Sequence, residues 1–192
     1  GPGFDFNGDG SVRIAVLSPA VHAGGIDAAV WATDLEGILK ASLKCPVRVG
    51  LVPLGKYRSM MGWWYAPDTD AEREKLVNGQ TDLLLLAEHE EIVKRYPEFF
   101  FEGVRCVASL ARANGVKTAL VMMSSPRATP RDKLPDSTAE IVYRVGAGCG
   151  IEVIPAGYGW KQALFHNRMP GDSPQKGRSG GCVAPAAVDA QQ

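Results

Sequence analysis

Short apolar runs alternate along the chain with longer segments whose apolar residues recur at helical spacing. The apolar runs are rich in Val, Ile and Leu, and they predict five strands at 12–17, 47–52, 82–87, 117–123 and 151–154. The helical pattern predicts helices at 26–44, 71–79, 98–114 and 137–148, with a short one at 160–166. The third run, "DLLLLA", is continuously apolar, which is typical of a central parallel strand covered on both faces.

Strands separated by long helices predict a parallel sheet with right-handed crossovers. We therefore expect an α/β fold, a three-layer sandwich whose five-stranded parallel sheet has the flavodoxin-like order 2-1-3-4-5. In that topology ligands bind at the carboxyl ends of the strands, near the switch between the first and third strands. The segments predicted to carry chemistry are 18–25, 88–91 and 155–172.

The chain has 192 residues and a net charge of zero, with 21 basic and 21 acidic side chains. We expect one α/β domain at 12–166, preceded by a tag remnant and polar leader at 1–11 and followed by a Gly/Pro/Ser/Ala-rich tail at 167–192. The balanced charge does not favour a nucleic-acid partner or an acidic membrane surface. The apolar runs are shorter than the roughly 20 residues that span a bilayer, so no membrane partner is expected.

Four cysteines lie far apart, at 45, 106, 149 and 182, and form no CxxC pair. They are predicted to be thiols rather than disulfides or zinc ligands. The first two residues, Gly-Pro, resemble the remnant of a protease-cleaved tag. The location therefore stays open: exported, to the periplasm or outside the cell, if a signal peptide was removed, and cytoplasmic otherwise.

All three histidines follow predicted strands: His22 the first, His89 the third and His166 the fifth. Glu88 adjoins His89, and a carboxylate beside an imidazole raises its pKa and orients it, as a general base requires. The same histidines could instead bind a metal, although loops from separate strands give no ligand spacing to test. The chain contains neither GxGxxG nor GxxxxGK[ST], so no nucleotide cofactor is predicted.

The segment 57–65 ends in three consecutive aromatic residues, Trp63, Trp64 and Tyr65. Aromatic rings exposed in a loop provide faces on which sugars stack, so these residues are candidates for substrate binding together with His22. The alternative is that the rings pack over the sheet as a lid.

From about Val12 to Trp160 the sequence resembles the SGNH/GDSL hydrolase superfamily. The resemblance rests on "VRIAVLSPAVHAGG", "GKYRSMMGWW" and "TDLLLLAEHEE", and above all on "YPEFFFEGVRCVASLARANGVKTALVMMSSP" and "IVYRVGAGCGIEVIPAGYGWKQAL". It implies an esterase or acyltransferase with a serine nucleophile after the first strand and an Asp-x-x-His base near the carboxyl terminus. The family's oxyanion is held by the serine N–H, a glycine after the second strand and an asparagine after the third.

The family's motifs are degenerate in this chain. Where the family has Gly-Asp/Asn-Ser, the sequence reads Ser18-Pro19-Ala20, which places Ser18 two residues before the nucleophile's position. Gly55 or Gly62 matches the oxyanion glycine. The family's Gly-x-Asn-Asp reads Ala87-Glu88-His89-Glu90, and "GDSPQKG", with Asp172, resembles the terminal motif without its histidine.

Two main functions follow. The first is hydrolysis of a small-molecule or glycan ester, with Ser18 as nucleophile, His89 or His166 as base, and Glu88 or Asp172 orienting it; Ser124 and Ser125 are alternative nucleophiles. The second is an inactive hydrolase scaffold that binds a glycan or other ligand through its aromatic segment. A histidine metal site and a small flavodoxin-like signalling or nucleotide-binding domain remain further alternatives.

Overall fold

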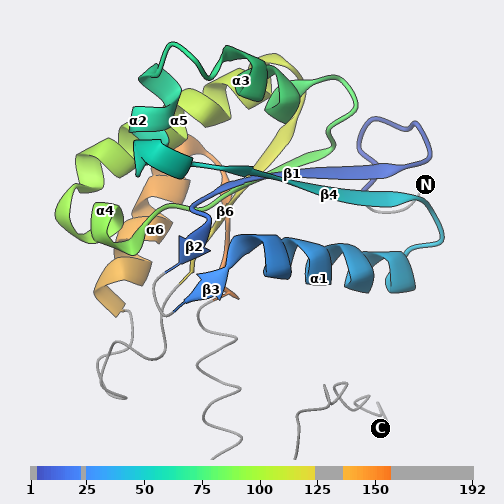
Figure 1. Ribbon diagram of the computed structural model, residues 1–192, viewed down its shortest axis with the longest axis horizontal. Helices are drawn as coiled ribbons and strands as arrows, with labels where there is room; N and C mark the ends of the chain where they lie inside the picture. The colour runs from blue at the N-terminus through green and yellow to red at the C-terminus, as the bar shows by residue number, and fades with distance from the viewer. Residues whose placement is uncertain (1–3, 23–24, 124–135, 157–192) are drawn as a thin grey trace, which may run out of the picture.

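A computed structural model describes residues 4–22, 25–123 and 136–156, which form a central parallel sheet with helices on both faces (Figure 1). The five strands lie in the order β4-β1-β5-β6-β7, and all neighbours are parallel. Counted as the five predicted strands, this is the order 2-1-3-4-5, so the predicted fold is confirmed. The strands are β1 (Val12–Ser18), β4 (Val47–Pro53), β5 (Leu83–Leu86), β6 (Lys117–Val121) and β7 (Glu152–Ile154).

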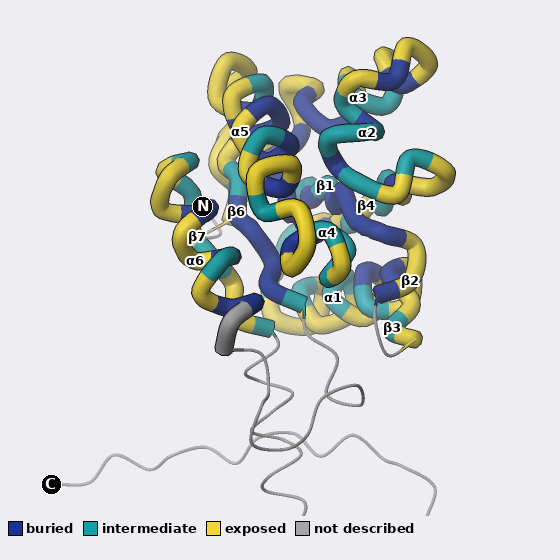
Figure 2. Tube along the Cα trace, turned by 90° about the vertical axis from the view of Figure 1, so that its left-hand side faces the viewer, coloured by how far each residue is buried: buried dark blue, intermediate teal, exposed yellow. Residues whose placement is uncertain are grey.

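The sheet divides the core into two clusters, one on each of its faces. One cluster contains side chains of α2 (Met60–Tyr65), α3 (Asp70–Val77), α4 (Glu90–Arg95), α5 (Pro97–Ala113) and α6 (Asp136–Cys149). Among the described helices, only α1 (Ala28–Ser42) contributes side chains to the other cluster. The strands are largely buried between these layers, whereas the outer helix surfaces are exposed (Figure 2).

The chain leaves β1 through a small hairpin that the apolar pattern did not predict. β2 (Val21–His22) pairs antiparallel with β3 (Ile26–Asp27) through a turn in which Gly25 has φ +78°. The predicted start of the first helix at 26 was therefore early by two residues. Asp27 caps α1 by accepting hydrogen bonds from the N–H groups of Ala29 and Val30 at 2.8 and 3.3 Å.

The segment after β4, expected to be an irregular loop, contains a 3₁₀ turn, η1 (Gly55–Tyr57), and the helix α2. Ser59 caps α2 by accepting a hydrogen bond from the N–H of Gly62. The start of α3 receives no side-chain hydrogen bond from its N-cap residue. Thr69 is the N-cap residue, but its hydroxyl donates to the carbonyls of Trp63 and Ala66, which fixes the end of α2 instead.

The remaining elements follow the prediction except for α4, a short helix that the sequence did not indicate. The three cysteines in the described part of the chain, Cys45, Cys106 and Cys149, are free thiols, as expected. No described helix combines the length and hydropathy needed to cross a membrane. The predicted helix at 160–166 and the tail at 167–192 lie outside the described residues.

Candidate functional site

Ser18 and His22 form a buried pair at the carboxyl end of β1. Ser18 is the last residue of the strand, and the β2–β3 hairpin turns His22 back toward it, so that Ser18 Oγ lies 2.9 Å from His22 Nε2. The same hydroxyl lies 2.9 Å from the carbonyl oxygen of Pro19, which gives its proton two alternative acceptors. Ser18 is fully buried and His22 is only 5% exposed.

Burial, and to a lesser extent the nearby charge of His89, lowers the pKa of His22 to about 4. The imidazole is therefore neutral at neutral pH, and a neutral ring nitrogen can accept a proton from a hydroxyl group. Sequence reasoning placed His22 among substrate-binding residues rather than bases. The Ser-x-x-x-His spacing before a glycine-containing turn is the signal that was available.

Glu88 binds backbone amides at the carboxyl end of β5. Its Oε2 accepts a hydrogen bond from Met60 N–H and its Oε1 one from His89 N–H, both at 2.8 Å. The side chain is buried, and burial raises its pKa to about 7 against the opposing effect of these two hydrogen bonds. Glu88 thus connects the start of α2 to the segment that follows β5. The sequence predicted that Glu88 would orient a histidine ring, but both of these hydrogen bonds are to backbone N–H groups.

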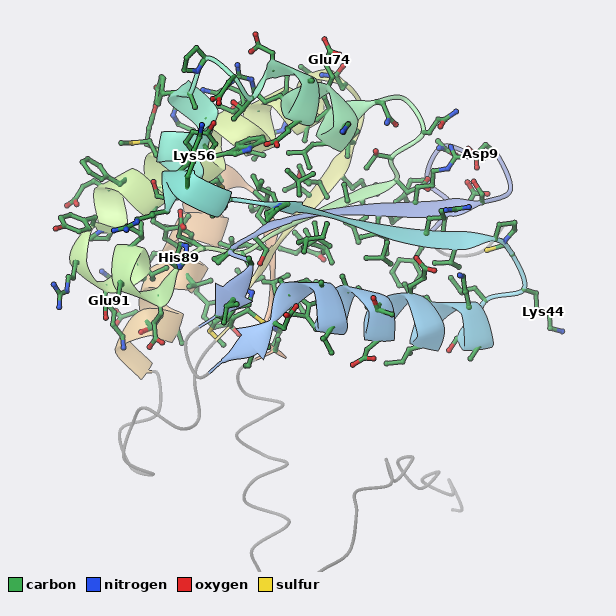
Figure 3. All side chains as sticks on the ribbon, viewed as in Figure 1. Asp9, Lys44, Lys56, Glu74, His89 and Glu91 are labelled. Atoms are coloured by element: carbon green, nitrogen blue, oxygen red, sulfur yellow. The ribbon has the colours of Figure 1, made fainter. Side chains whose placement is uncertain are left out.

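His89 is half-buried at the carboxyl edge of the sheet, at the end away from Asp9 and Lys44 (Figure 3). Burial lowers its pKa, and the positive charge of Arg58 lowers it further. Arg58 is the one non-glycine residue with positive φ, +58°, in the described part of the chain. The Met60–Glu88 hydrogen bond holds this segment beside His89.

Gly55 and Gly62, the two glycines proposed to bind the oxyanion, differ in whether their N–H groups are free to donate a hydrogen bond. The N–H of Gly62 donates to Ser59 Oγ at 3.0 Å, so it is occupied by the cap of α2. Gly55 is the first residue of η1 and has φ +58°, and its N–H belongs to the first turn, where amides lack partners within the helix. Leu54, which precedes it, donates its N–H to Ser18 O at 2.8 Å. Gly55 is therefore the glycine that lies beside Ser18.

The three aromatic residues do not form one exposed surface. Trp63 is fully buried and its indole N–H donates to Glu72 at 2.7 Å, so the prediction that its ring stacks on a ligand does not fit its position. Trp64 is half-buried with the guanidinium of Arg73 5.4 Å from its ring centre. Tyr65 is 64% exposed. Trp63, Trp64 and Tyr65 lie in a helix, α2, and consecutive side chains of a helix point in different directions.

The other proposed residues, Ser124, Ser125, His166 and Asp172, lie outside the described residues. Within residues 4–22, 25–123 and 136–156, no group of three or more His, Cys, Asp or Glu side chains is arranged to hold a metal ion.

Solved structures with the same architecture are SGNH hydrolases and esterases. A protein from Slackia heliotrinireducens assigned to the SGNH hydrolases matches with a TM-score of 0.60 and 16% identity over 79% of this chain and 83% of the other. The acetylxylan esterase Axe2 from Geobacillus stearothermophilus matches with a TM-score of 0.54 and 10% identity over 80% of both chains. TesA matches with a TM-score of 0.52 and 19% identity over 73% of this chain and 76% of the other.

The chain has the SGNH-hydrolase fold. No protein-family model matches its sequence, and no curated protein matches it either. Fold similarity at this level of identity does not transfer catalytic residues.

Proposed function

We propose that this protein is an SGNH-fold ester hydrolase in which Ser18 is the nucleophile and His22 is the general base. The observation that carries the proposal is the 2.9 Å approach of Ser18 Oγ to a buried, neutral His22 Nε2. A nucleophile and a base within hydrogen-bond distance at the carboxyl edge of a parallel sheet make the arrangement that acyl transfer needs. Both groups come from one short segment and require no residue from the carboxyl-terminal part of the chain.

In the proposed reaction Ser18 Oγ forms a bond to the acyl carbon while its proton passes to His22 Nε2. The C–O bond of the ester then breaks, and the leaving alcohol takes that proton from His22. Water attacks the acyl-serine with His22 again accepting a proton, which releases the carboxylic acid and restores the Ser18 hydroxyl. Atoms and charge balance without a cofactor.

The negative charge on the acyl oxygen needs hydrogen-bond donors. Gly55 is the residue after Leu54, whose N–H donates to Ser18 O. His89 comes after β5, the strand that flanks β1 on the side opposite β4. The N–H of Gly55 and the side chain of His89 are the proposed donors, in place of the glycine and asparagine that SGNH enzymes use. Pro19 has no N–H to contribute, so this oxyanion hole is expected to stabilise the intermediate less well than a complete one.

We propose a short acyl ester as the substrate, carried by a small molecule or a carbohydrate. Axe2, one of the structural neighbours, is an acetylxylan esterase. The exposed ring of Tyr65 and the half-buried ring of Trp64 lie on α2, the helix that Glu88 joins to the exit of β5. These rings give a carbohydrate two surfaces to stack on.

The complete burial of Ser18 favours a second function, ligand binding without acyl transfer. A hydroxyl that no solvent reaches also has no access to an acyl carbon until the β2–β3 hairpin moves. In this alternative the Ser18–His22 hydrogen bond only holds the hairpin against β1.

Turnover of p-nitrophenyl acetate by the full chain tests the proposal. The wild-type protein should release p-nitrophenol above the buffer rate, and Ser18→Ala and His22→Gln should each lose that activity by roughly 100-fold or more. Ser42→Ala is the matched control, because the Ser42 hydroxyl bonds only to Ile38 O on the exposed side of α1. It should retain the wild-type rate.

Three results separate the alternatives. Equal activity in wild type and Ser18→Ala would show that another group acts, and it would end the proposed role of Ser18. No activity in any variant, with binding of acetylated xylo-oligosaccharides that survives Ser18→Ala and weakens in Tyr65→Ala, would establish the binding scaffold. Loss of activity only in variants whose circular dichroism also changes would reduce Ser18 and His22 to structural residues.

A further inference from the structure

Arg58 lies at the carboxyl edge of the sheet, on a segment that hydrogen bonds fix at both ends. On one side of it, Leu54 N–H donates to Ser18 O at 2.8 Å. On the other side, Met60 N–H donates to Glu88 Oε2 at 2.8 Å. Because Ser18 ends β1 and Glu88 follows β5, these bonds place Arg58 between the exits of two neighbouring strands. The residue is exposed, so a ligand that approaches this edge can reach it.

The backbone of Arg58 adopts a conformation that its side chain makes unfavourable. Its φ of +58° and ψ of −5° lie in the left-handed region, and the other described residues with positive φ are all glycines. In that region the Cβ atom lies too close to a carbonyl oxygen, so glycine is the usual occupant. Strain of this kind is found mainly at functional sites, which points to a role for the arginine side chain.

The guanidinium of Arg58 is also free to bind a ligand. Within residues 4–22, 25–123 and 136–156, no ion pair involves it. Glu88 is buried and accepts backbone N–H groups. The lysine of η1 and all the charged side chains of α4 are already in ion pairs, which are Lys56–Asp68, Glu90–Lys94 and Glu91–Arg95.

Arg58 is close enough to His89 for its charge to act on the imidazole ring. Burial lowers the pKa of His89, and the positive charge of Arg58 lowers it further. The ring is therefore neutral at neutral pH, and the guanidinium carries the positive charge beside it. Figure 3 shows His89 and Lys56 of η1 at the same end of the sheet. A substrate whose acyl oxygen binds His89 would thus have Arg58 within reach of its other groups.

We propose that Arg58 binds a carboxylate group of the substrate, so that the ester hydrolysed at Ser18 is an anionic one. The inference rests on the proposed function, because it names the class of substrate for the same site. A guanidinium binds a carboxylate through two parallel N–H···O hydrogen bonds. An arginine without an internal ion pair makes these bonds without breaking another.

Two acetyl esters that differ by one charge provide the test with the full chain. 5-Acetoxy-2-nitrobenzoate carries a carboxylate on its nitrophenol leaving group, and its methyl ester is neutral. The ratio of the two kcat/KM values is measured for wild type and for each variant, so the difference in chemical reactivity between the esters cancels. Arg58→Gln should lower the anionic-to-neutral ratio roughly 10-fold by slowing only the anionic ester. Arg58→Lys should keep part of the preference, because it retains the charge without the two-pronged geometry.

Lys56→Gln is the matched control, because it removes a neighbouring positive charge that Asp68 already neutralises. Its ratio should stay within about two-fold of the wild-type ratio. Arg58→Gly is a second variant, which removes the side chain and relieves the strained backbone. It should lose the preference as Arg58→Gln does while its melting temperature does not fall, so that unfolding cannot explain the loss.

Two results would overturn the inference and leave the hydrolase in place. One is an unchanged ratio in Arg58→Gln. The other is an equal loss of activity toward both esters, because Arg58 would then act on the acyl group that the two esters share.

If the wild-type chain hydrolyses neither ester, the proposed function fails, and calorimetric titration with the same two compounds decides the inference. Tighter binding of 5-acetoxy-2-nitrobenzoate than of its methyl ester, with the difference lost in Arg58→Gln, would support the role of Arg58. Equal binding of the two compounds, or no binding of either, would overturn it.

Discussion

At the scale of single residues, His22 and Glu88 are two buried ionisable groups near the carboxyl ends of the strands. Burial shifts their pKa values in opposite directions, so their effects on stability depend on pH in opposite ways. The folded-state pKa of His22 is about 4, below its usual value of 6.5, because burial disfavours the imidazolium. The folded-state pKa of Glu88 is about 7, above its usual value of 4.5, because burial disfavours the carboxylate. Neither environment is visible in the sequence, where both residues follow strands as ordinary polar residues do.

The two shifts predict opposite pH dependences. Between pH 4 and 6.5 the unfolded state holds more protons at His22, so this group's contribution is complete above pH 6.5 and is lost as the pH falls toward 4. Between pH 4.5 and 7 the folded state holds more protons at Glu88, so its contribution is present below pH 4.5 and is lost as the pH rises toward 7. In wild type the two effects largely cancel where the windows overlap.

Single variants should separate these effects. The free energy of unfolding of Glu88→Gln, relative to wild type, should rise by roughly 3 kcal/mol from pH 4.5 to 7, and that of His22→Gln should fall by a similar amount from pH 4 to 6.5. Urea denaturation at a series of pH values measures both. A difference from wild type that is constant with pH in both variants would mean that neither group is shifted by burial.

At the scale of elements, the packing of α2 on α5 positions the segment that Glu88 binds. Gly103 of α5 lies against the start of α2, and a Cβ built there would be 2.9 Å from Met61 N and 3.1 Å from Met60 Cβ. This contact could not be predicted from the sequence, because no helix was predicted between the strand at 47–52 and the helix at 71–79, and α2 was missed. A helix of six residues is too short for a periodic pattern.

Gly103→Ala should therefore destabilise the fold by about 1–3 kcal/mol, since backbone atoms of α2 must move to admit the methyl group. Gly37→Ala in α1 is the matched control: a Cβ added to Gly37 would have no atom within 4 Å, and alanine should stabilise the helix by about 0.5–1 kcal/mol. Thermal unfolding compares the two. Equal effects would show that α2 and α5 are not in close contact.

Asp82, just before β5, joins the amino-terminal leader to the sheet. Its Oδ1 accepts hydrogen bonds from the N–H groups of Phe6 and Asn7 at 2.9 and 3.1 Å, and its Oδ2 accepts one from Arg13 N–H at 2.8 Å. Asp82→Ala leaves these donors without their acceptor and should cost about 2–3 kcal/mol in the free energy of unfolding. Asp34→Ala, at an exposed position in α1, should change it by less than about 0.5 kcal/mol. Similar losses in both variants would contradict the role of Asp82.

At the scale of the whole molecule, the fold could be predicted because strand and helix periods recur throughout the chain. β5 shows this most clearly: four leucines in a row identified a central strand, and it lies between β1 and β6. For the site, the sequence predicted only its location, at the carboxyl ends of the strands, and not which side chains meet there. The partner of Ser18 depends on a hairpin of two-residue strands, and the burial of Trp63 depends on the helical turn of α2, neither of which local hydropathy encodes.

Covalent labelling with a fluorophosphonate tests the proposed hydrolase most directly, because such reagents react with a serine hydroxyl that a neighbouring base activates. We predict that the wild-type chain gains one phosphonate group, that peptide mass spectrometry places it on Ser18, and that His22→Gln prevents the reaction. An unlabelled wild-type chain, or a label on any other residue, would contradict the account.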